Sequence, residues 1–217
     1  MGAERQKNIM PDIVIVAGGR CSLPEHEELM KGAFLIGADR GALYLAEEGY
    51  RADLAVGDFD SVMEDEMKTI SGNSDEILRL PSEKDETDLE AALRRALSLE
   101  GAIHILGATG TRLDQTFSAL DLLKVCHDRC RVAFIYDSSN RIRLVKGHAV
   151  IRKSRYRYVS LIPYGDGTAT VSLRGFKYSG EHISLGRGTS LGISNEIAGD
   201  AAEIETDTCL FVFESDD

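Results

Sequence analysis

The chain has 217 residues, 43% of them hydrophobic and 28% charged, with a formal net charge of −11. That composition is ordinary for a globular protein with a hydrophobic core. The negative charge argues against nucleic-acid binding, which requires a basic surface. No apolar run approaches the roughly 18 residues of a membrane span, and residues 1–10 lack the apolar core of a signal peptide. We therefore expect neither nucleic acid nor a membrane as partner. Four scattered cysteines indicate reduced thiols and a cytoplasmic location.

Strand and helix patterns alternate over the first half of the chain. Strands are predicted at 12–17, 34–38, 54–57, 76–80, 103–106 and 132–136. Helices are predicted between them at 24–31, 42–48, 63–70, 89–97 and 113–125. This rhythm is typical of a doubly wound, mainly parallel sheet, so residues 1–137 are predicted to form an α/β domain.

The helix from Leu89 to Leu97 has the strongest pattern. Its apolar residues follow the i, i+3, i+4, i+7 spacing of one buried face. Thr87 and Glu90 predict a capping box at its start, and Gly101 predicts its stop.

The pattern changes near residue 140. Short β-prone segments follow at 141–151, 156–163, 169–173, 182–185, 202–205 and 209–213, separated by turns such as 164–167 and 186–188. Since no helix pattern intervenes, residues 141–217 are predicted to form an all-β domain, an antiparallel sandwich or a barrel.

The segment Gly57-Asp58-Phe59-Asp60-Ser61 follows the buried strand at 54–57. If the backbone stays extended, Asp58 and Asp60 point to the same side. Two carboxylates 4 Å apart repel by about 4 kcal/mol at an effective dielectric of 20, so they favour a hard divalent cation such as Mg²⁺. The alternative is a solvated Asp-rich turn.

Lys84-Asp85-Glu86-Thr87-Asp88 opens the strongest helix. Asp85 and Asp88 lie close together at a helix N-terminus, where the macrodipole favours negative charge. They are either part of an acidic site or acids that only stabilise the helix. Lys84 is either a surface lysine or a phosphate contact.

Residues 107–115 link a strand to a helix through glycines that let backbone N–H groups approach an anion. Arg112 could hold a phosphate, and Asp114 a metal or a hydroxyl group. The segment is neither a P-loop nor a dinucleotide fingerprint, and a plain turn is nearly as good an interpretation. Gly18-Gly19 and Asp39 end two further strands. Because these strand ends share one edge of a doubly wound sheet, together they predict a cleft for phosphate and metal.

In the β half, Ser190-Leu191-Gly192-Ile193-Ser194-Asn195-Glu196 combines small residues with hydroxyl and amide groups. Such a loop suits recognition of a polar heterocycle, although spacing alone favours a hairpin turn.

Four motifs in order resemble the thiamine pyrophosphokinase (thiamine diphosphokinase) family. They are Gly57-Asp58-Phe59-Asp60-Ser61, Lys84-Asp85-x-Thr87-Asp88 with Glu90, Gly110-x-Arg112-x-Asp114, and Ser194-Asn195-Glu196. The resemblance implies an α/β ATP-binding catalytic domain (1–137) followed by a β-sandwich thiamine-binding domain (141–217). It also implies transfer of pyrophosphate from ATP to the thiamine hydroxyl with release of AMP, by a homodimer whose active sites lie at the subunit interface.

The expected site has three groups of residues. Catalysis and Mg²⁺ binding are expected from Asp58, Asp60, Asp85 and Asp88. ATP contacts are expected from Gly18, Gly19, Asp39, Lys84, Thr87, Arg112 and Asp114. Thiamine contacts are expected from Ser190, Ser194 and Asn195. The chain departs from the family pattern at Arg40, Thr111 and Gln115, which bears on the nucleotide contacts. The alternatives are another Mg-ATP phosphotransferase of this fold and a non-enzymatic thiamine or nucleotide-binding protein.

Overall fold

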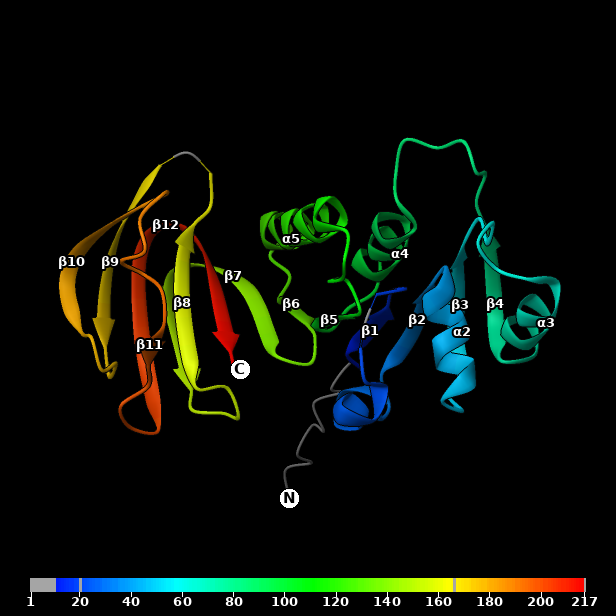
Figure 1. The fold of residues 1–217 in the computed structure, drawn as a ribbon, viewed down its shortest axis with the longest axis horizontal. Coiled ribbons are helices and arrows are strands. Elements are labelled where there is room, and N and C mark those ends of the chain that lie inside the picture. Colours follow the sequence, from blue (N-terminus) through cyan, green and yellow to red (C-terminus); the bar gives the residue numbers. More distant parts are fainter. Residues whose placement is uncertain (1–10, 20, 166, 217) are drawn as a thin grey trace, which may run out of the picture. The chain divides into compact units, whose positions relative to one another are not determined.

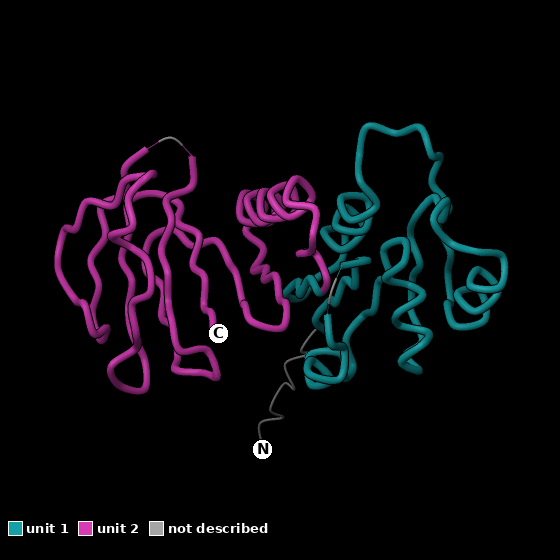
Figure 2. The backbone as a smooth tube through the Cα atoms, viewed as in Figure 1, with its two compact units in different colours: residues 1–106 teal, residues 107–217 magenta. Residues whose placement is uncertain are grey.

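The computed structural model describes residues 11–19, 21–165 and 167–216, and the chain divides into two compact units (Figures 1 and 2). Unit 1 spans Met1–Leu106 and unit 2 spans Gly107–Asp217. The predicted ranges 1–137 and 141–217 are those of an ATP-binding and a thiamine-binding domain. These functional domains stay a prediction. None of the helices in the described ranges is long and apolar enough to cross a bilayer.

Unit 1 is built on a parallel sheet in the order β5-β1-β2-β3-β4. The chain steps outward from β1 to β4 and then returns to the other side of β1 as β5. The strands are β1 (Ile13–Val16), β2 (Phe34–Ala38), β3 (Ala52–Gly57), β4 (Ser74–Arg79) and β5 (Ile103–Leu106). All four residues of β1 are buried, so both faces of the sheet are covered, as the continuous apolar runs predicted.

Helices follow the strands of unit 1 as predicted, with one difference. They are α1 (Glu27–Met30), α2 (Arg40–Glu47), α3 (Glu64–Gly72) and α4 (Asp88–Leu97). Helices α2 and α4 both pack on β1, β2 and β3. The helix predicted at 24–31 begins instead with a 3₁₀ turn, Leu23–His26, which has Pro24 in its first positions, where a missing N–H costs no hydrogen bond.

Helix α4 confirms its predicted apolar face and half of its predicted capping box. The hydroxyl oxygen of Thr87 accepts a hydrogen bond from the Glu90 N–H at 3.2 Å. The other half of the box is missing, because the carboxylate of Glu90 accepts a hydrogen bond from Arg94, one turn later, at 3.0 Å. The Thr87 cap contributes about 1 kcal/mol to the helix that carries Asp88.

Unit 2 begins with α5 (Leu113–Asp128) and is otherwise a β-rich structure with antiparallel pairing. Its strands are β6 (Ala133–Tyr136), β7 (Asn140–Arg152), β8 (Tyr158–Pro163), β9 (Thr168–Arg174), β10 (Gly180–Gly186), β11 (Asn195–Glu196) and β12 (Ala201–Ser215). An α/β unit with a parallel sheet followed by a β-rich unit confirms the predicted fold class.

Strand β12 corrects one prediction, because the segments expected as two strands, 202–205 and 209–213, form one. It pairs with β7 along its length, with a register shift between Thr206 and Leu210. Its first part also pairs with β9 and its last part with β8, so these two strands share the edge of β12 opposite β7. Asp207 accepts the Thr170 N–H at 2.9 Å at this bulge, which explains why a polar segment that resembles a turn remains within a strand.

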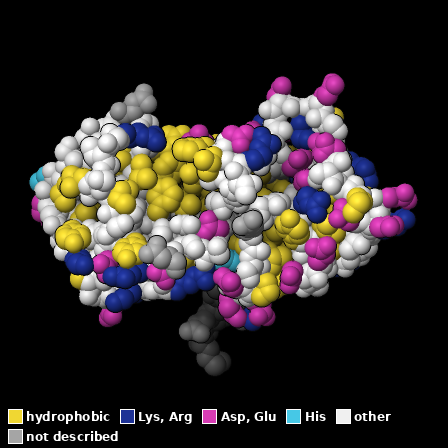
Figure 3. All heavy atoms as spheres, in the orientation of Figure 1, with side chains coloured by type: hydrophobic (Ala, Val, Ile, Leu, Met, Phe, Trp, Pro, Cys, Tyr) yellow, Lys and Arg dark blue, Asp and Glu magenta, His cyan; other side chains and the backbone are white. Residues whose placement is uncertain are grey.

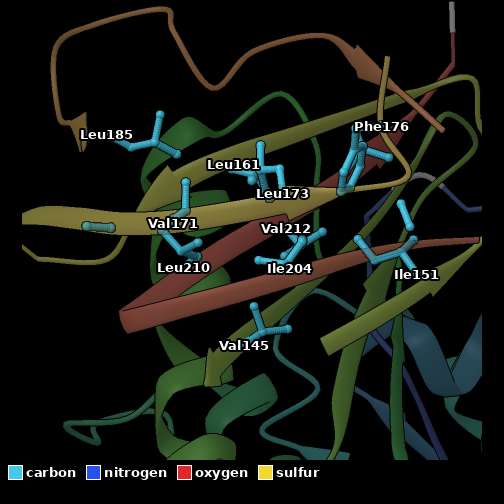
Figure 4. Packing of buried hydrophobic residues seen from close by; sticks show 13 residues of the cluster. Val145, Ile151, Leu161, Val171, Leu173, Phe176, Leu185, Ile204, Leu210 and Val212 are labelled. Carbon is cyan, nitrogen blue, oxygen red and sulfur yellow. The ribbon is translucent and has the colours of Figure 1, made fainter. Parts of the chain in front are cut away.

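The core of unit 2 is formed by apolar side chains that converge from several strands. Figure 4 shows side chains of β7, β8, β9, β10 and β12 pointing toward one interior. Leu161, Leu173, Phe176 and Leu185 from this core also line a cavity.

Candidate active site

The carboxyl ends of β2 and β3 lie against each other and place Asp39 beside the Asp58 loop. The Asp39 N–H donates to the Val56 carbonyl at 2.8 Å. A Cβ on Gly57 would lie 3.1 Å from Asp39 Cα, so glycine permits this close approach. The sequence predicted that the strand ends at Asp39 and at Gly57 share one edge of the sheet. The contacts of Asp39 with Val56 and Gly57 confirm that these two strand ends are neighbours.

The Asp58–Asp60 segment does not continue as an extended strand, which corrects one premise of the sequence analysis. Phe59 has φ 59°, in the left-handed region, while its side chain is buried. The chain therefore turns at Phe59, and Asp58 Oδ1 accepts the Asp60 N–H at 3.1 Å. Asp58 is held inward and Asp60 is exposed, so the two carboxylates do not share one extended face.

Lys84 joins two of the predicted acids. Its Nζ donates to Asp58 Oδ2 at 2.7 Å and forms an ion pair with Asp88 Oδ1 at 3.2 Å. The side chains of Lys84 and Asp58 are only 11% and 10% exposed. The two acids lie at the end of β3 and the start of α4, and the lysine brings them together. Lys84 is therefore not the free surface lysine of the first interpretation, and its contact with a phosphate stays a prediction.

The electrostatics of this cluster follow from that arrangement. The hydrogen bond from Lys84 lowers the pKa of Asp58, and the same bond raises the pKa of Lys84. Burial raises the pKa of Asp88, and the nearby charges of Asp58 and Asp39 act in the same direction, while Lys84 opposes them. The cluster therefore carries more negative charge than its one lysine neutralises.

Asp39 provides an oxygen that lacks a hydrogen-bond partner within the described part of the chain. Its backbone has φ 49°, uncommon for a residue other than glycine. Oδ2 accepts the hydroxyl of Ser61 at 3.0 Å, whereas Oδ1 is buried and unpaired. Buried polar atoms are normally satisfied, so this oxygen is available to a ligand. The sequence analysis did not single out Ser61, although it stands in the Asp58 motif.

Arg40, where the chain departs from the family pattern, is part of this framework. Its guanidinium donates to the Ser61 carbonyl at 3.3 Å and lies 3.7 Å from a carboxylate oxygen of Glu66. The other Glu66 oxygen accepts the Met63 N–H at 2.8 Å at the start of α3. Arg40 therefore ties the Asp58–Ser61 loop to two helices.

The remaining predicted residues of unit 1 lie outside the buried cluster of Asp58, Lys84 and Asp88. Asp60, Asp85 and Thr87 are exposed, and Gly18 and Gly19 follow β1. The carbonyl of Gly18 accepts the Tyr44 hydroxyl at 3.3 Å. In the described ranges, no three side chains of His, Cys, Asp or Glu are arranged to hold a metal ion. The Lys84 ammonium lies between Asp58 and Asp88 instead.

The predicted nucleotide contacts Arg112 and Asp114 lie in unit 2, at the start of α5. Both are exposed, and Arg112 donates to Asp114 at 2.6 Å. This pair raises the pKa of Arg112 and lowers that of Asp114. Thr111 and Gln115, the other two departures, are exposed.

The predicted thiamine-binding loop borders a cavity of about 360 Å³ in unit 2. Ser190 and Asn195 line this cavity, whereas Ser194 is not among its lining residues. Most of the wall is apolar, and it includes Tyr178, which the sequence analysis did not identify. A hydrophobic cavity with a few polar groups is the usual form of a small-molecule site.

Two family models match the chain, one after the other. A family model described as the thiamin pyrophosphokinase catalytic domain matches residues 26–134. A second, described as the thiamin pyrophosphokinase vitamin B1 binding domain, matches residues 147–211.

The chain belongs to the thiamine pyrophosphokinase family.

Individual relatives extend this similarity over nearly the whole chain. Thiamine pyrophosphokinase of Bacillus subtilis is 35% identical over 194 residues, covering 87% of this chain and 90% of that protein. The crystal structure of that enzyme aligns with a TM-score of 0.88, covering 95% of this chain and 99% of that one. Thiamin pyrophosphokinase from Geobacillus thermodenitrificans aligns with a TM-score of 0.84 at 33% identity, covering 94% and 97%.

Proposed function

We propose that this chain is a thiamine pyrophosphokinase that transfers pyrophosphate from ATP to the hydroxyl group of thiamine, giving thiamine diphosphate and AMP. The observation that carries the proposal is the match of both family domains, in order, along one chain. The clustered acids of unit 1 and the cavity of unit 2 supply the two kinds of site that this reaction requires.

We assign ATP and Mg²⁺ to the acidic cluster of unit 1. Carboxylate oxygens are the ligands that Mg²⁺ prefers, and the unpaired buried oxygen of Asp39 fits such a donor set. Asp58, Asp60 and Asp88 would hold the ion, with Asp39 added to the predicted set and the exposed Asp85 beside it. When bound, Mg²⁺ supplies positive charge that neutralises the phosphate oxygens of ATP.

The reaction needs little covalent chemistry from the protein. The thiamine hydroxyl oxygen attacks the β-phosphorus of ATP, the bond from that phosphorus to the oxygen of the α-phosphate breaks, and AMP leaves. One carboxylate of the cluster accepts the hydroxyl proton. Lys84 and Arg112 provide positive charge for the phosphates of ATP. Gly18, Gly19 and Thr87 let the protein approach these phosphates closely. Positioning and charge neutralisation therefore dominate catalysis.

We assign thiamine to the cavity lined by Ser190 and Asn195, with Ser194 in the same loop. We also propose a cytoplasmic homodimer whose active sites are shared between subunits. Figure 3 shows hydrophobic side chains at the surface of unit 2, and the large apolar side chains Leu113 and Phe117 are exposed one turn apart on α5. An apolar strip on a surface helix supports an interface with a second copy.

Release of AMP tests the proposal directly. Purified protein with Mg-ATP should release AMP only when thiamine is present, with an equal amount of thiamine diphosphate. Release of ADP, or AMP release with a different alcohol only, would indicate another phosphotransferase of this fold. Binding of thiamine without turnover would indicate a sensor.

A further inference from the structure

Two consecutive residues at the start of α2 hold Ser61 from two sides. The carboxylate of Asp39 accepts the Ser61 hydroxyl at 3.0 Å, and the guanidinium of Arg40 donates to the Ser61 carbonyl at 3.3 Å. Arg40 therefore contacts the main chain of the loop, whereas Asp39 contacts a side chain. Ser61 is 22 and 21 residues away from these two partners, so the contacts join the end of β2 to the loop after β3.

The Arg40 side chain is itself held by neighbours on two helices. It lies 3.7 Å from a carboxylate oxygen of Glu66, whose other oxygen accepts the Met63 N–H at 2.8 Å at the start of α3. A hydrogen bond with Tyr44, one turn later on α2, raises the pKa of Arg40. The Tyr44 hydroxyl also donates to the Gly18 carbonyl at 3.3 Å. Arg40 is therefore part of a network that joins the loops after β1, β2 and β3.

The loop that Arg40 contacts places Asp60 through its backbone. Phe59 has φ 59°, and the Val62 N–H donates to the Phe59 carbonyl at 3.2 Å. Asp60 and Ser61 are the two central residues of this turn. A left-handed residue such as Phe59 persists only where the surrounding structure holds it. Asp60 is exposed, so packing around its side chain does not fix it, and its place depends on how firmly the turn is held.

The charge of Arg40 by itself would act against metal binding. A guanidinium close to carboxylates repels a cation that those carboxylates attract. An arginine that orients the carboxylates has the opposite effect, because ligands that are already in place bind a metal ion more tightly. The Arg40 side chain is 38% exposed and paired with Glu66, so solvent and that carboxylate weaken its repulsion. The two effects predict opposite changes in metal affinity when Arg40 is replaced.

We infer that Arg40 is a positioning residue of the proposed metal and phosphate site. Its hydrogen bond to the Ser61 carbonyl holds the turn after β3, and this fixes Asp60 relative to Asp39. The inference rests on the proposed function, because it concerns the carboxylates to which we assign Mg²⁺. Arg40 acts through its neighbours, so no contact between its guanidinium and a substrate is required.

Titration of the full-length protein with Mn²⁺ in the absence of ATP tests this inference without any turnover. Arg40→Met keeps the aliphatic stem and removes every donor, so it should weaken Mn²⁺ binding about tenfold, as measured by calorimetry. Arg40→Lys, which keeps a charge and a donor, should stay within about threefold of the wild type.

Arg51→Met is the matched control. Arg51 also donates to two carbonyls, those of Gly72 and Ser74, at 3.0 and 3.3 Å, but it precedes β3 and so lies at the other end of that strand. This variant should lower the melting temperature, as the loss of two hydrogen bonds requires, and leave Mn²⁺ binding within about twofold of the wild type.

Steady-state rates give a second measurement. At saturating thiamine, Arg40→Met should raise the Mg²⁺ concentration for half-maximal AMP release about tenfold. The KM for thiamine should stay within about twofold of the wild type, because the cavity to which we assign thiamine lies in unit 2.

Two outcomes overturn the inference. Tighter Mn²⁺ binding by Arg40→Met would mean that Arg40 acts only as a repelling charge, and unchanged Mn²⁺ and Mg²⁺ requirements would mean that it does not hold the site. If Arg40→Met does not fold, Glu66→Gln takes its place with the same expected weakening, since it removes the carboxylate beside the guanidinium and keeps an oxygen for the Met63 N–H. A wild-type protein that binds Mn²⁺ without thiamine-dependent AMP release would instead refute the proposed function, so the two failures are distinguishable.

Discussion

Lys84 Nζ donates a hydrogen bond to Asp58 Oδ2 at 2.7 Å, although 26 residues separate them, and both side chains are largely buried. The same ammonium is 3.2 Å from Asp88 Oδ1. In the absence of Mg-ATP, the lysine therefore neutralises the acids to which we assign the metal. If Asp58 and Asp88 hold Mg²⁺ as we propose, Lys84 would have to move away from them, and its charge would then be free for the phosphates.

Replacing Lys84 by Met should increase the affinity of the nucleotide-free protein for Mg²⁺ or Mn²⁺ several-fold. The variant removes the competing ammonium and leaves two carboxylates facing each other, which a divalent cation relieves. Calorimetric titration without ATP measures the change. Lys68→Met is the matched control, since Lys68 pairs with Glu64 and Asp65 on the surface of α3. Equal metal affinity in all three proteins would contradict this role of Lys84.

Asp60→Asn and Asp88→Asn should each leave the fold intact and reduce turnover by at least about 10²-fold, roughly 2.7 kcal/mol of barrier. Each change removes one negative charge from the proposed phosphate and metal site. Steady-state AMP release and circular dichroism measure the two quantities. Asp75→Asn, at an exposed pair with Arg51, should retain full turnover. Near-normal rates in both site variants would mean that these acids only stabilise the turn and the helix.

The stability that the Lys84–Asp58 pair contributes should depend on pH in a defined window. The hydrogen bond from Lys84 lowers the pKa of Asp58, so its contribution is present above the ordinary aspartate value, about 4, and is lost as pH falls through the lowered value. Lys84 has a raised pKa, chiefly from Asp58, so its contribution is present below about 10.4 and is lost above the raised value.

Urea unfolding of the wild type and Lys84→Met at a series of pH values measures this dependence. The difference in free energy of unfolding should be constant between about pH 5 and 9 and should shrink below about pH 4. A difference that grows as the solution is acidified would have the wrong sign for this ion pair.

Gly37→Ala should destabilise the protein by about 1–3 kcal/mol. A Cβ at Gly37 on β2 would overlap the backbone of Ala42 on α2, so the helix would have to move away from the sheet beside Asp39. Gly72→Ala, at the end of α3, meets no neighbouring atom and should be neutral or stabilising by up to about 1 kcal/mol. Urea midpoints of both variants give the comparison, and similar midpoints would contradict the packing argument.

Co-expression of Asn195→Ala with Asp60→Asn should give more activity than either variant alone. If two subunits build each site, a mixed dimer contains one site in which both halves are intact. Differently tagged chains purified in tandem isolate the mixed dimer for measurement of AMP release. Activity no higher than that of the two parents would mean that each chain builds its own site.

Local patterns determined much of this protein. The apolar spacing from Leu89 to Leu97, the Thr87 cap and the buried β1 segment all reflect interactions within a few residues, and they were predictable for that reason. The order of the short motifs also indicated the family before any contact was known. The same local reasoning divided β12 into two strands, because the polar Thr206–Thr208 segment resembles a turn and its partner, Thr170, is distant in sequence.

Tertiary structure decided the roles within the sites. Asp58 and Asp60 would share a face only on an extended backbone, but burial of the Phe59 ring turns the chain between them. Lys84 meets Asp58 across 26 residues, and Arg40 meets Ser61 across 21. No periodicity records such pairs, because the packing of separate elements brings them together. The sequence therefore determined which residues were available for chemistry, and folding decided that Lys84 bridges the acids and that Arg40 contacts the loop after β3.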